Sequence, residues 1–180
     1  MIILMGLAGS GKSTQGQLLA KDLGWIWLSA GQVLRDTPDP MIHELQRRGE
    51  LVPDRLTIPL MQKTIEQVWA EGKDVILDGY PRDLEQAQWI AEHWAEQIEL
   101  IVRIVVPRQE LIRRMKLRGR DDDLSSEAIE ERFRIVDEYN VQICKHFAKQ
   151  GVKIRAIDGV GTVEEVQARI RQALTEVKSE

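Results

Sequence analysis

Short apolar runs alternate with longer amphipathic segments along the 180 residues of the chain. Five of these runs have the length of a β-strand, and they lie at residues 1–5, 25–28, 74–78, 100–106 and 152–157. Runs that are apolar at nearly every position are typical of strands covered on both faces, as in a parallel sheet. The intervening segments are long enough to return the chain to the same end of such a sheet. The pattern therefore predicts an α/β fold built on a five-stranded parallel sheet.

The amphipathic segments predict eight helices. Apolar positions recur with helical spacing at residues 12–23, 31–36, 39–49, 54–71, 83–95, 107–118, 126–150 and 162–178. Thr162 and Glu165 match a capping box at the start of the last helix. The polar segments 35–40 and 118–126 are too short to be separate domains, so we expect loops over a site. Residues 1–180 are therefore expected to form one three-layer α/β/α domain.

Composition and charge narrow the class of protein. Hydrophobic residues make up 43% of the chain and charged residues 30%, a balance typical of globular proteins. The formal net charge of −4 opposes binding to nucleic acid and to anionic membranes, so neither partner is expected. No apolar run reaches the length of a membrane span, and no basic segment precedes the first strand as in a signal peptide. We therefore predict a cytoplasmic protein, whose single Cys144 has no internal disulfide partner.

A glycine-rich turn follows the first predicted strand. Residues 6–13, GLAGSGKS, match the P-loop pattern G-x-x-x-x-G-K-[ST], and a helix is expected directly after them. In this motif backbone N–H groups converge on phosphate oxygens, Lys12 reaches the outer phosphates and the Ser13 hydroxyl ligates Mg²⁺. The P-loop does not identify the molecule that receives the phosphoryl group, because GTPases, motor ATPases and small-molecule kinases share this loop.

A second cluster of polar residues follows the third predicted strand, in the segment LDGYPRD at 77–83. Asp78 lies at the carboxyl end of that strand, where ligands bind in open α/β sheets, and a carboxylate there can hold Mg²⁺ through water. Arg82 can direct a guanidinium group at a phosphate. Because Gln86 is four residues further on, the two side chains can share one face at the start of a helix.

Several segments together resemble the nucleoside monophosphate kinase family, and adenylate kinases above all. They are GLAGSGKSTQ, LSAGQVLRD, GELVPD, LDGYPRDLEQA, LRGRDDD and IDGVGTVEEV, and in this order they cover nearly the whole chain. The resemblance implies a P-loop NTPase-type fold and Mg²⁺-dependent transfer of the γ-phosphoryl group of ATP to AMP by a monomer. It also implies a reduced NMP-binding region at 30–58 and a short lid loop at 119–127. The lid has neither the length nor the cysteines of a zinc-binding lid, so no zinc is expected.

The resemblance implies a role for individual residues. ATP would be bound by Gly9, Ser10, Gly11, Lys12, Ser13, Thr14, Arg114, Arg118 and Gly161. AMP would be bound by Ala30, Arg35, Leu51, Val52, Gly79, Arg82, Gln86, Arg120 and Arg132, with Gln86 reading the adenine edge. Lys12, Arg82, Arg118, Arg120 and Arg132 would be catalytic, and Ser13 and Asp78 would hold Mg²⁺. The five positive charges within residues 113–120 fit this interpretation, because donor and acceptor phosphates carry several negative charges.

Three alternatives remain open at this stage. Ser29, Ala30 and Gly31 match the Ser-Ala-Gly of UMP/CMP kinases, whereas adenylate kinases usually have Ser-Thr-Gly. Against this, UMP/CMP kinases usually have asparagine at the position of Gln86. An ATPase without an acceptor nucleotide would not need Arg35, Arg82 and Gln86 together. A kinase of a small metabolite would lack the LDGYPR and GELVPD segments.

Overall fold

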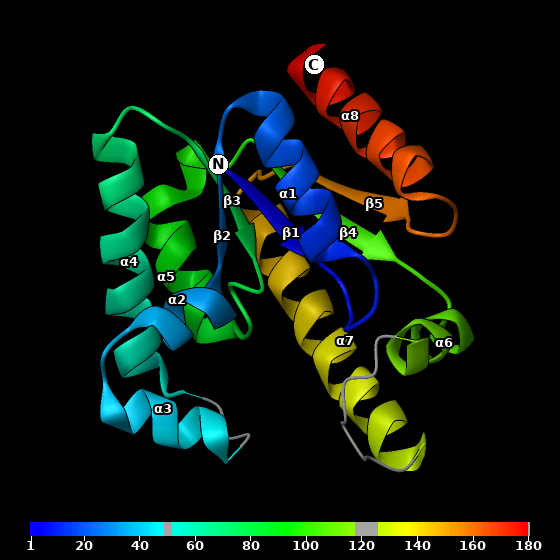
Figure 1. The fold of residues 1–180 in the computed structure, drawn as a ribbon. Coiled ribbons are helices and arrows are strands. Elements are labelled where there is room, and N and C mark those ends of the chain that lie inside the picture. The colour runs from blue at the N-terminus through cyan, green and yellow to red at the C-terminus, as the bar shows by residue number, and fades with distance from the viewer. Residues whose placement is uncertain (49–51, 118–125, 180) are drawn as a thin grey trace.

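In the computed structural model, which describes residues 1–48, 52–117 and 126–179, five parallel strands form one sheet (Figure 1). The strands are β1 (Ile2–Met5), β2 (Ile26–Ser29), β3 (Val75–Asp78), β4 (Leu100–Val105) and β5 (Ile154–Asp158). Their order in the sheet is β2-β3-β1-β4-β5. The predicted five-stranded parallel sheet is thus confirmed, with strand ends within two residues of those expected.

Helices connect the strands and extend beyond them. They are α1 (Lys12–Leu23), α2 (Ala30–Asp36), α3 (Pro40–Arg47), α4 (Asp54–Ala70), α5 (Leu84–Trp94), the 3-10 turn η1 (Ala95–Gln97), α6 (Arg108–Leu117), α7 (Ser126–Lys149) and α8 (Val163–Ser179). The predicted capping box is confirmed at the start of α8. There Glu165 accepts a hydrogen bond from the Thr162 N–H at 2.8 Å, and the Thr162 hydroxyl accepts one from the Glu165 N–H at 3.2 Å.

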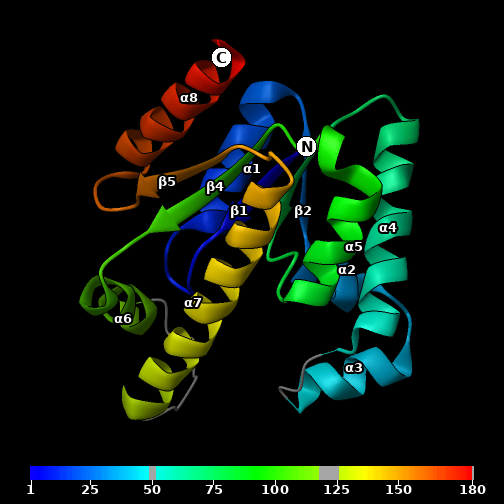
Figure 2. The same cartoon turned by 180° about the vertical axis from the view of Figure 1, so that it is seen from behind.

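Helices cover both faces of the sheet (Figures 1 and 2). Successive strand residues point to opposite faces, so Ile3 and Leu77 pack on one side while Ile2 and Leu4 pack on the other. The first face is covered by apolar residues of α4, α5 and α7, and the second mainly by those of α1 and α8. This arrangement confirms the expected three layers and explains why the strands are apolar at nearly every position.

The strand order places several loops at one edge of the sheet. In the register of the sheet, Asp78 of β3 lies opposite Leu4 of β1 and opposite Ser29 of β2, so the three strands end at the same level. The chain leaves β1 toward β2 on one side, whereas it leaves β3 and crosses β1 to reach β4. Loops that diverge in this way leave a crevice at the carboxyl edge, where open α/β sheets bind ligands.

Two groups of helices extend past the carboxyl edge, α2 and α3 on one side and α6 on the other (Figure 1). Among the described residues no helix is both long enough and apolar enough to cross a bilayer.

Candidate functional site

The glycine-rich turn after β1 is folded tightly against its surroundings. Gly6 has φ 149°, and a Cβ atom there would lie 2.7 Å from the Ile104 carbonyl oxygen and 2.8 Å from the Ser10 hydroxyl. Gly9, with φ 83°, leaves only 3.1 Å between such an atom and the Leu111 carbonyl oxygen. Side chains at either position would open the turn, so glycine is required for its close approach to β4 and α6.

The turn leads directly into the N-terminus of α1. Gly11 is the N-cap, no side chain caps the helix, and the first turn of α1 contains no acidic residue. The first-turn N–H groups of an α-helix have no intrahelical acceptor and carry partial positive charge, so they can bind an anion. Lys12 lies beside them, with its ammonium group donating to the Leu7 carbonyl oxygen at 3.0 Å. Ser13 and Thr14 are exposed at this end of the helix.

Ser13 and Asp78, expected to hold Mg²⁺, are in direct contact although 65 positions separate them in the chain. The Ser13 hydroxyl donates a hydrogen bond to Asp78 Oδ2 at 2.6 Å. Asp78 is buried at the end of β3, with 4% of its surface exposed. One hydroxyl and one carboxylate oxygen suit Mg²⁺, which prefers oxygen ligands and keeps several waters when bound to proteins. In the described ranges no group of three or more His, Cys, Asp and Glu side chains is arranged to enclose a metal by itself.

Two arginines from different elements meet beside Gly31 in α2. A Cβ atom at Gly31 would lie 3.4 Å from Arg35 Nη1 and 3.7 Å from Arg82 Nη2. Arg82 Nε donates to the Gly79 carbonyl oxygen at 2.8 Å, which orients its guanidinium group. Removal from solvent lowers the pKa of Arg82, the nearby Asp78 opposes this shift, and the positive charges of Arg132 and Arg35 add to it. Arginines from α2, from α7 and from the loop after β3 therefore create one cationic region near Asp78.

Gln86 is held by the protein on both ends of its amide. Its Oε1 accepts from the Arg82 backbone N–H at 2.8 Å, and its Nε2 donates to Asp54 Oδ1 at 2.6 Å. The side chain is buried, with 3% exposed. The expected sharing of a helix face with Arg82 is wrong, because α5 begins at Leu84 and Arg82 lies before it. The Arg82 guanidinium points to Gly79 while the Gln86 amide points to α4.

The remaining expected residues lie in several places around this edge. Ala30 is the first residue of α2 and is 1% exposed within the core cluster under α4 and α5. Val52 precedes α4, and its carbonyl oxygen accepts from the Thr57 hydroxyl at 3.2 Å. Arg132 is exposed on α7. Leu51, Arg118 and Arg120 lie outside the described residues.

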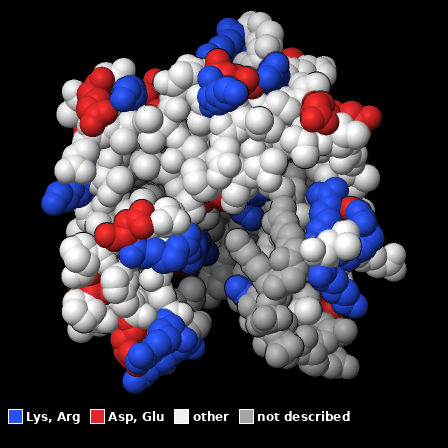
Figure 3. Space-filling view, in the orientation of Figure 1, with Lys and Arg blue, Asp and Glu red and all other residues white. Residues whose placement is uncertain are grey.

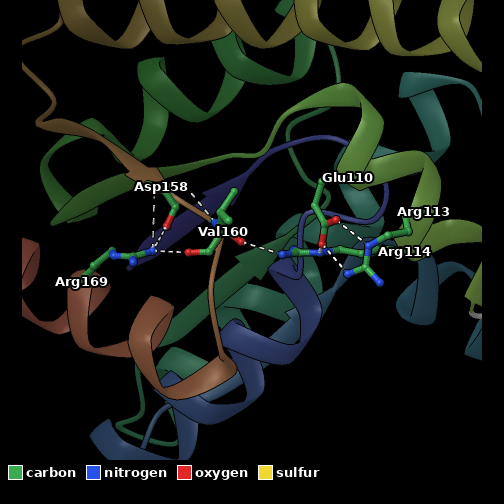
Figure 4. A network of polar contacts seen from close by, with 7 residues as sticks. Glu110, Arg113, Arg114, Asp158, Val160 and Arg169 are labelled. Carbon is green, nitrogen blue, oxygen red and sulfur yellow. Dashed lines mark hydrogen bonds and ion pairs between the residues drawn. The ribbon is translucent and has the colours of Figure 1, made fainter.

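A further arginine bridges α6 and the segment between β5 and α8 (Figure 4). Arg114 donates to Glu110 Oε1 at 2.7 Å and to the Gly159 carbonyl oxygen at 3.0 Å. Gly161, two residues further on, has φ 127°, a backbone conformation that residues with a side chain rarely adopt. Arg114 and Gly161, both expected at the donor nucleotide, are therefore brought to the same side of the site.

The structure also brings in residues that the sequence patterns did not indicate. Asp54 holds Gln86, and Glu110 holds Arg114. Asp54 follows Pro53 at the start of a helix, and Glu110 lies in the first turn of α6, so each reads as an ordinary N-terminal acidic residue. The spacing of four residues between Glu110 and Arg114 was the available signal for the second pair.

Positive charge gathers around the carboxyl edge although the chain is acidic overall. In Figure 3, Lys and Arg side chains flank the hollow, over α2 and α3 on the left and over α6 on the right. A site of this kind attracts polyanions such as nucleotides.

Comparisons with known proteins agree with this geometry. A family model described as adenylate kinase matches residues 4–152. An adenylate kinase of Thermus thermophilus is 36% identical over 186 aligned positions, which cover 96% of each chain. Adenylate kinases of Prochlorococcus marinus and Maricaulis maris are 33% and 34% identical over 97% of this chain and 98% of their own lengths.

Proposed function

The chain belongs to the adenylate kinase family, a family of phosphotransferases, and from this premise we propose that it transfers the γ-phosphoryl group of ATP to AMP, giving two ADP. The single observation that carries the choice of an acceptor nucleotide is the meeting of Arg35 and Arg82 beside Gly31. Like charges repel, so two guanidinium groups held together predict an anion between them. An ATPase that uses water has no need of this second anion site.

The donor nucleotide is assigned to the P-loop side of the crevice. We assign its phosphates to Gly9, Ser10, Gly11, Lys12, Ser13 and Thr14, and its base side to Arg114 and Gly161, with Arg118 as a further cation. The N-terminus of α1 supports the phosphate assignment, because no side chain caps it and first-turn N–H groups carry partial positive charge that attracts an anion. The ammonium of Lys12, now bonded to the Leu7 carbonyl, would exchange that neutral acceptor for a charged phosphate oxygen.

The acceptor nucleotide is assigned to the α2 side. We assign its phosphate to Arg35, Arg82, Arg120 and Arg132, and its base to Ala30, Leu51, Val52, Gly79 and Gln86. The amide of Gln86 keeps one N–H and one oxygen lone pair beyond its bonds to Asp54 and Arg82. A donor and an acceptor side by side match the edge of adenine. We assign the NMP-binding region to residues 30–58 and the lid to 119–127, of which 126 and 127 already belong to α7.

Phosphoryl transfer in this site needs positioning and charge neutralisation more than acid–base chemistry. The acceptor phosphate of AMP is already an oxyanion at neutral pH, so no general base is required. Lys12, Arg82, Arg118, Arg120 and Arg132 are the residues that we propose to stabilise the charge of the transition state. Holding both nucleotides in line converts the encounter of two reactants into a unimolecular step.

Magnesium is proposed as the cofactor, held by the Ser13 hydroxyl and, directly or through water, by Asp78. These are the two oxygen groups that lie 2.6 Å apart at the end of β3. When bound, Mg²⁺ neutralises charge on the donor phosphates. The Ser13 hydroxyl donates its hydrogen to Asp78, so the lone pairs of its oxygen would be available to ligate the metal.

We propose that the protein acts as a cytoplasmic monomer whose partners are ATP and AMP. All the residues assigned to both nucleotides come from one chain. Its net charge of −4 argues against nucleic acid and anionic membranes as partners.

A UMP/CMP kinase is the alternative, and one observation favours it. Ala30 occupies the position where adenylate kinases usually have threonine, and it is buried at the start of α2. The site therefore lacks a hydroxyl that could help to select adenine.

The test is a coupled assay of ADP formation with ATP and, in turn, AMP, UMP, CMP, GMP or water as acceptor. We expect AMP to give the highest kcat/KM. A preference for CMP or UMP would replace the AMP assignment with the alternative. If no monophosphate raises turnover above the rate with water, the kinase proposal fails.

A further inference from the structure

The turn between β5 and α8 is held by two arginines from opposite sides (Figure 4). Arg169 Nη1 on α8 donates to the carbonyl oxygens of Asp158 and Val160, at 2.8 and 2.6 Å. Arg114 Nη2 on α6 donates to the carbonyl oxygen of the residue between them, Gly159, at 3.0 Å. Three consecutive carbonyls of residues 158–160, which we call the carbonyl turn, therefore each accept from a guanidinium group.

The carbonyl turn also packs closely against the end of β4. A Cβ atom at Gly159 would lie 2.6 Å from the methyl groups of both Ile104 and Val106, so the backbone rests directly on the end of β4. The Gly159 N–H donates to the Val105 carbonyl oxygen at 2.8 Å. The sheet therefore holds the carbonyl turn in place. Arg114 of α6 donates to this fixed segment.

Glu110 is the second anchor of Arg114. Its Oε1 accepts from Arg114 Nε at 2.7 Å, and the same carboxylate accepts two bonds from Arg113, at 2.6 and 2.8 Å. Hydrogen bonds from Arg113 and Arg114 lower the pKa of the Glu110 carboxyl to about 2, so it is ionised at neutral pH. The two arginines differ in setting, because 21% of the Arg114 side chain is exposed but 61% of Arg113.

These bonds constrain the orientation of the Arg114 guanidinium. A free arginine side chain samples many rotamers, and ordering it on binding a ligand costs free energy. Bonds from Nε to α6 and from Nη2 to the carbonyl turn fix the plane of the group, and neither of them uses Nη1. A planar guanidinium of fixed orientation is suited to stack on a nucleotide base or to bond its phosphates.

We propose that Glu110 is a positioning residue, which holds Arg114 against the carbonyl turn and so preorganises the base side of the donor site before ATP binds. This inference rests on the proposed function, since it takes Arg114 as a contact of the donor nucleotide. Glu110 itself contacts no substrate, and its effect passes through Arg114.

The test compares Glu110→Ala, Glu110→Gln and Arg114→Ala with the wild type, measuring KM for ATP, KM for AMP, kcat and the melting temperature. Loss of one charge-assisted bond that orders Arg114 predicts a rise of about threefold to tenfold in KM for ATP with Glu110→Ala. Glu110→Gln keeps an oxygen acceptor for Arg114 Nε, so its KM should lie between those of the wild type and Glu110→Ala. In the two Glu110 variants, kcat and KM for AMP should not change.

Arg113→Ala is the matched control, because it removes the other partner of the same carboxylate but leaves the bond to Arg114 in place. It should leave KM for ATP as in the wild type. An unchanged KM for ATP in Glu110→Ala, beside a raised one in Arg114→Ala, would overturn the positioning role alone. An equal rise in Arg113→Ala, or a parallel change in both KM values and in the melting temperature, would show that Glu110 acts only on the stability of α6. A wild type that transfers no phosphate to any monophosphate would instead overturn the proposed function.

Discussion

The Arg35 and Arg82 guanidinium groups both lie beside Gly31, within 3.4 and 3.7 Å of the position that a Cβ atom there would occupy. At the scale of single residues, this is the feature that separates a two-nucleotide site from a simple nucleotide-binding loop. Burial lowers the pKa of Arg82, Asp78 opposes that shift, and the positive charges of Arg132 and Arg35 add to it, so a bound phosphate would further favour the charged guanidinium.

Replacing Arg82 should therefore affect the acceptor and spare the donor. We expect Arg82→Ala to lower kcat/KM for AMP by about 10-fold to 100-fold, the range for loss of a hydrogen bond to a charged group. The dissociation constant for ATP, measured by calorimetry, should stay unchanged. Lys73→Ala is the control, since Lys73 is an exposed cation that precedes β3 at the opposite edge of the sheet. Unchanged turnover in Arg82→Ala would remove the acceptor role.

Filling the space beside the two arginines should also weaken AMP binding. In Gly31→Ala the new methyl group would lie 3.4 Å from Arg35 Nη1 and 3.7 Å from Arg82 Nη2, in ordinary contact with both, so it would take up space that we assign to the acceptor phosphate. Alanine favours a helix over glycine by up to about 1 kcal/mol, so the melting temperature should not fall. We expect KM for AMP to rise about threefold to tenfold at unchanged KM for ATP, a range again set by loss of about one hydrogen bond. An unaltered KM for AMP would contradict the placement of the acceptor phosphate.

At the scale of elements, the close packing of α1 on the sheet positions the P-loop, which leads directly into this helix. Gly16 is the point of closest approach: a Cβ atom there would lie 2.7 Å from Trp27 Cδ1 and 2.8 Å from Leu4 Cδ1. The distance of the helix from β1 and β2 sets where its N-terminus meets the phosphate.

Gly16→Ala should consequently lower stability despite the better helix propensity of alanine. Overpacking of this kind costs about 1–3 kcal/mol, whereas the gain in helix propensity is at most about 1 kcal/mol, so the net effect should be destabilising. Urea denaturation should show a lower midpoint, and KM for ATP should rise because the N-terminus of α1 moves. Gln17→Ala, an exposed neighbour on the same helix, is the control and should behave as the wild type. A Gly16→Ala protein as stable as the control would mean that Trp27 moves aside.

The start of α5 gives a pH-dependent prediction. Asp83 caps this helix by accepting from the Gln86 N–H at 2.9 Å, and burial together with the nearby Asp54 raises the pKa of its carboxyl. A raised pKa in the folded state means that this group favours folding most below its unfolded pKa, and that this contribution is lost as pH rises through the folded pKa. Asp83→Asn keeps the cap but not the charge, so its melting temperature relative to the wild type should increase with pH. Asp83→Ala should be less stable than Asp83→Asn by about 0.5–2 kcal/mol at every pH, because both lack the charge and only alanine also loses the cap. A constant difference between Asn and wild type across pH 3–7 would contradict the raised pKa.

For the molecule as a whole, an acidic chain presents a cationic crevice. The net charge is −4, yet Lys and Arg side chains flank the hollow at the carboxyl edge (Figure 3). Attraction of nucleotides by these charges is screened by salt, since the Debye length is about 10 Å at 0.1 M and about 3 Å at 1 M.

Salt should weaken the binding of both nucleotides. We expect KM for ATP and for AMP to rise as NaCl is raised from about 0.05 M to about 0.5 M, because the Debye length shortens several-fold over this range. Measurements at matched osmolality with sucrose separate this effect from general changes of solvent. KM values that do not depend on salt would show that the charges around the crevice do not attract the substrates.

Local patterns determined much of this protein. The strand and helix positions, the capping box of Thr162 and Glu165, and the P-loop follow from residues close together in the chain, since periodicity, caps and tight turns are set within a few residues. The family resemblance assigned residues to each nucleotide, and those assignments remain proposals.

Only the tertiary structure decided which distant groups meet. The strand order brings Ser13 to Asp78, and α2 and the turn after β3 bring Arg35 to Arg82. Gln86 bonds to Asp54 across 32 positions of the chain, and it does not share a helix face with Arg82, because α5 begins two residues after that arginine. The choice of Glu110 as the anchor of Arg114 likewise depends on where the carbonyl turn rests on β4. Such contacts depend on how strands are ordered and how closely helices pack, and a linear pattern of polar and apolar residues does not contain that information.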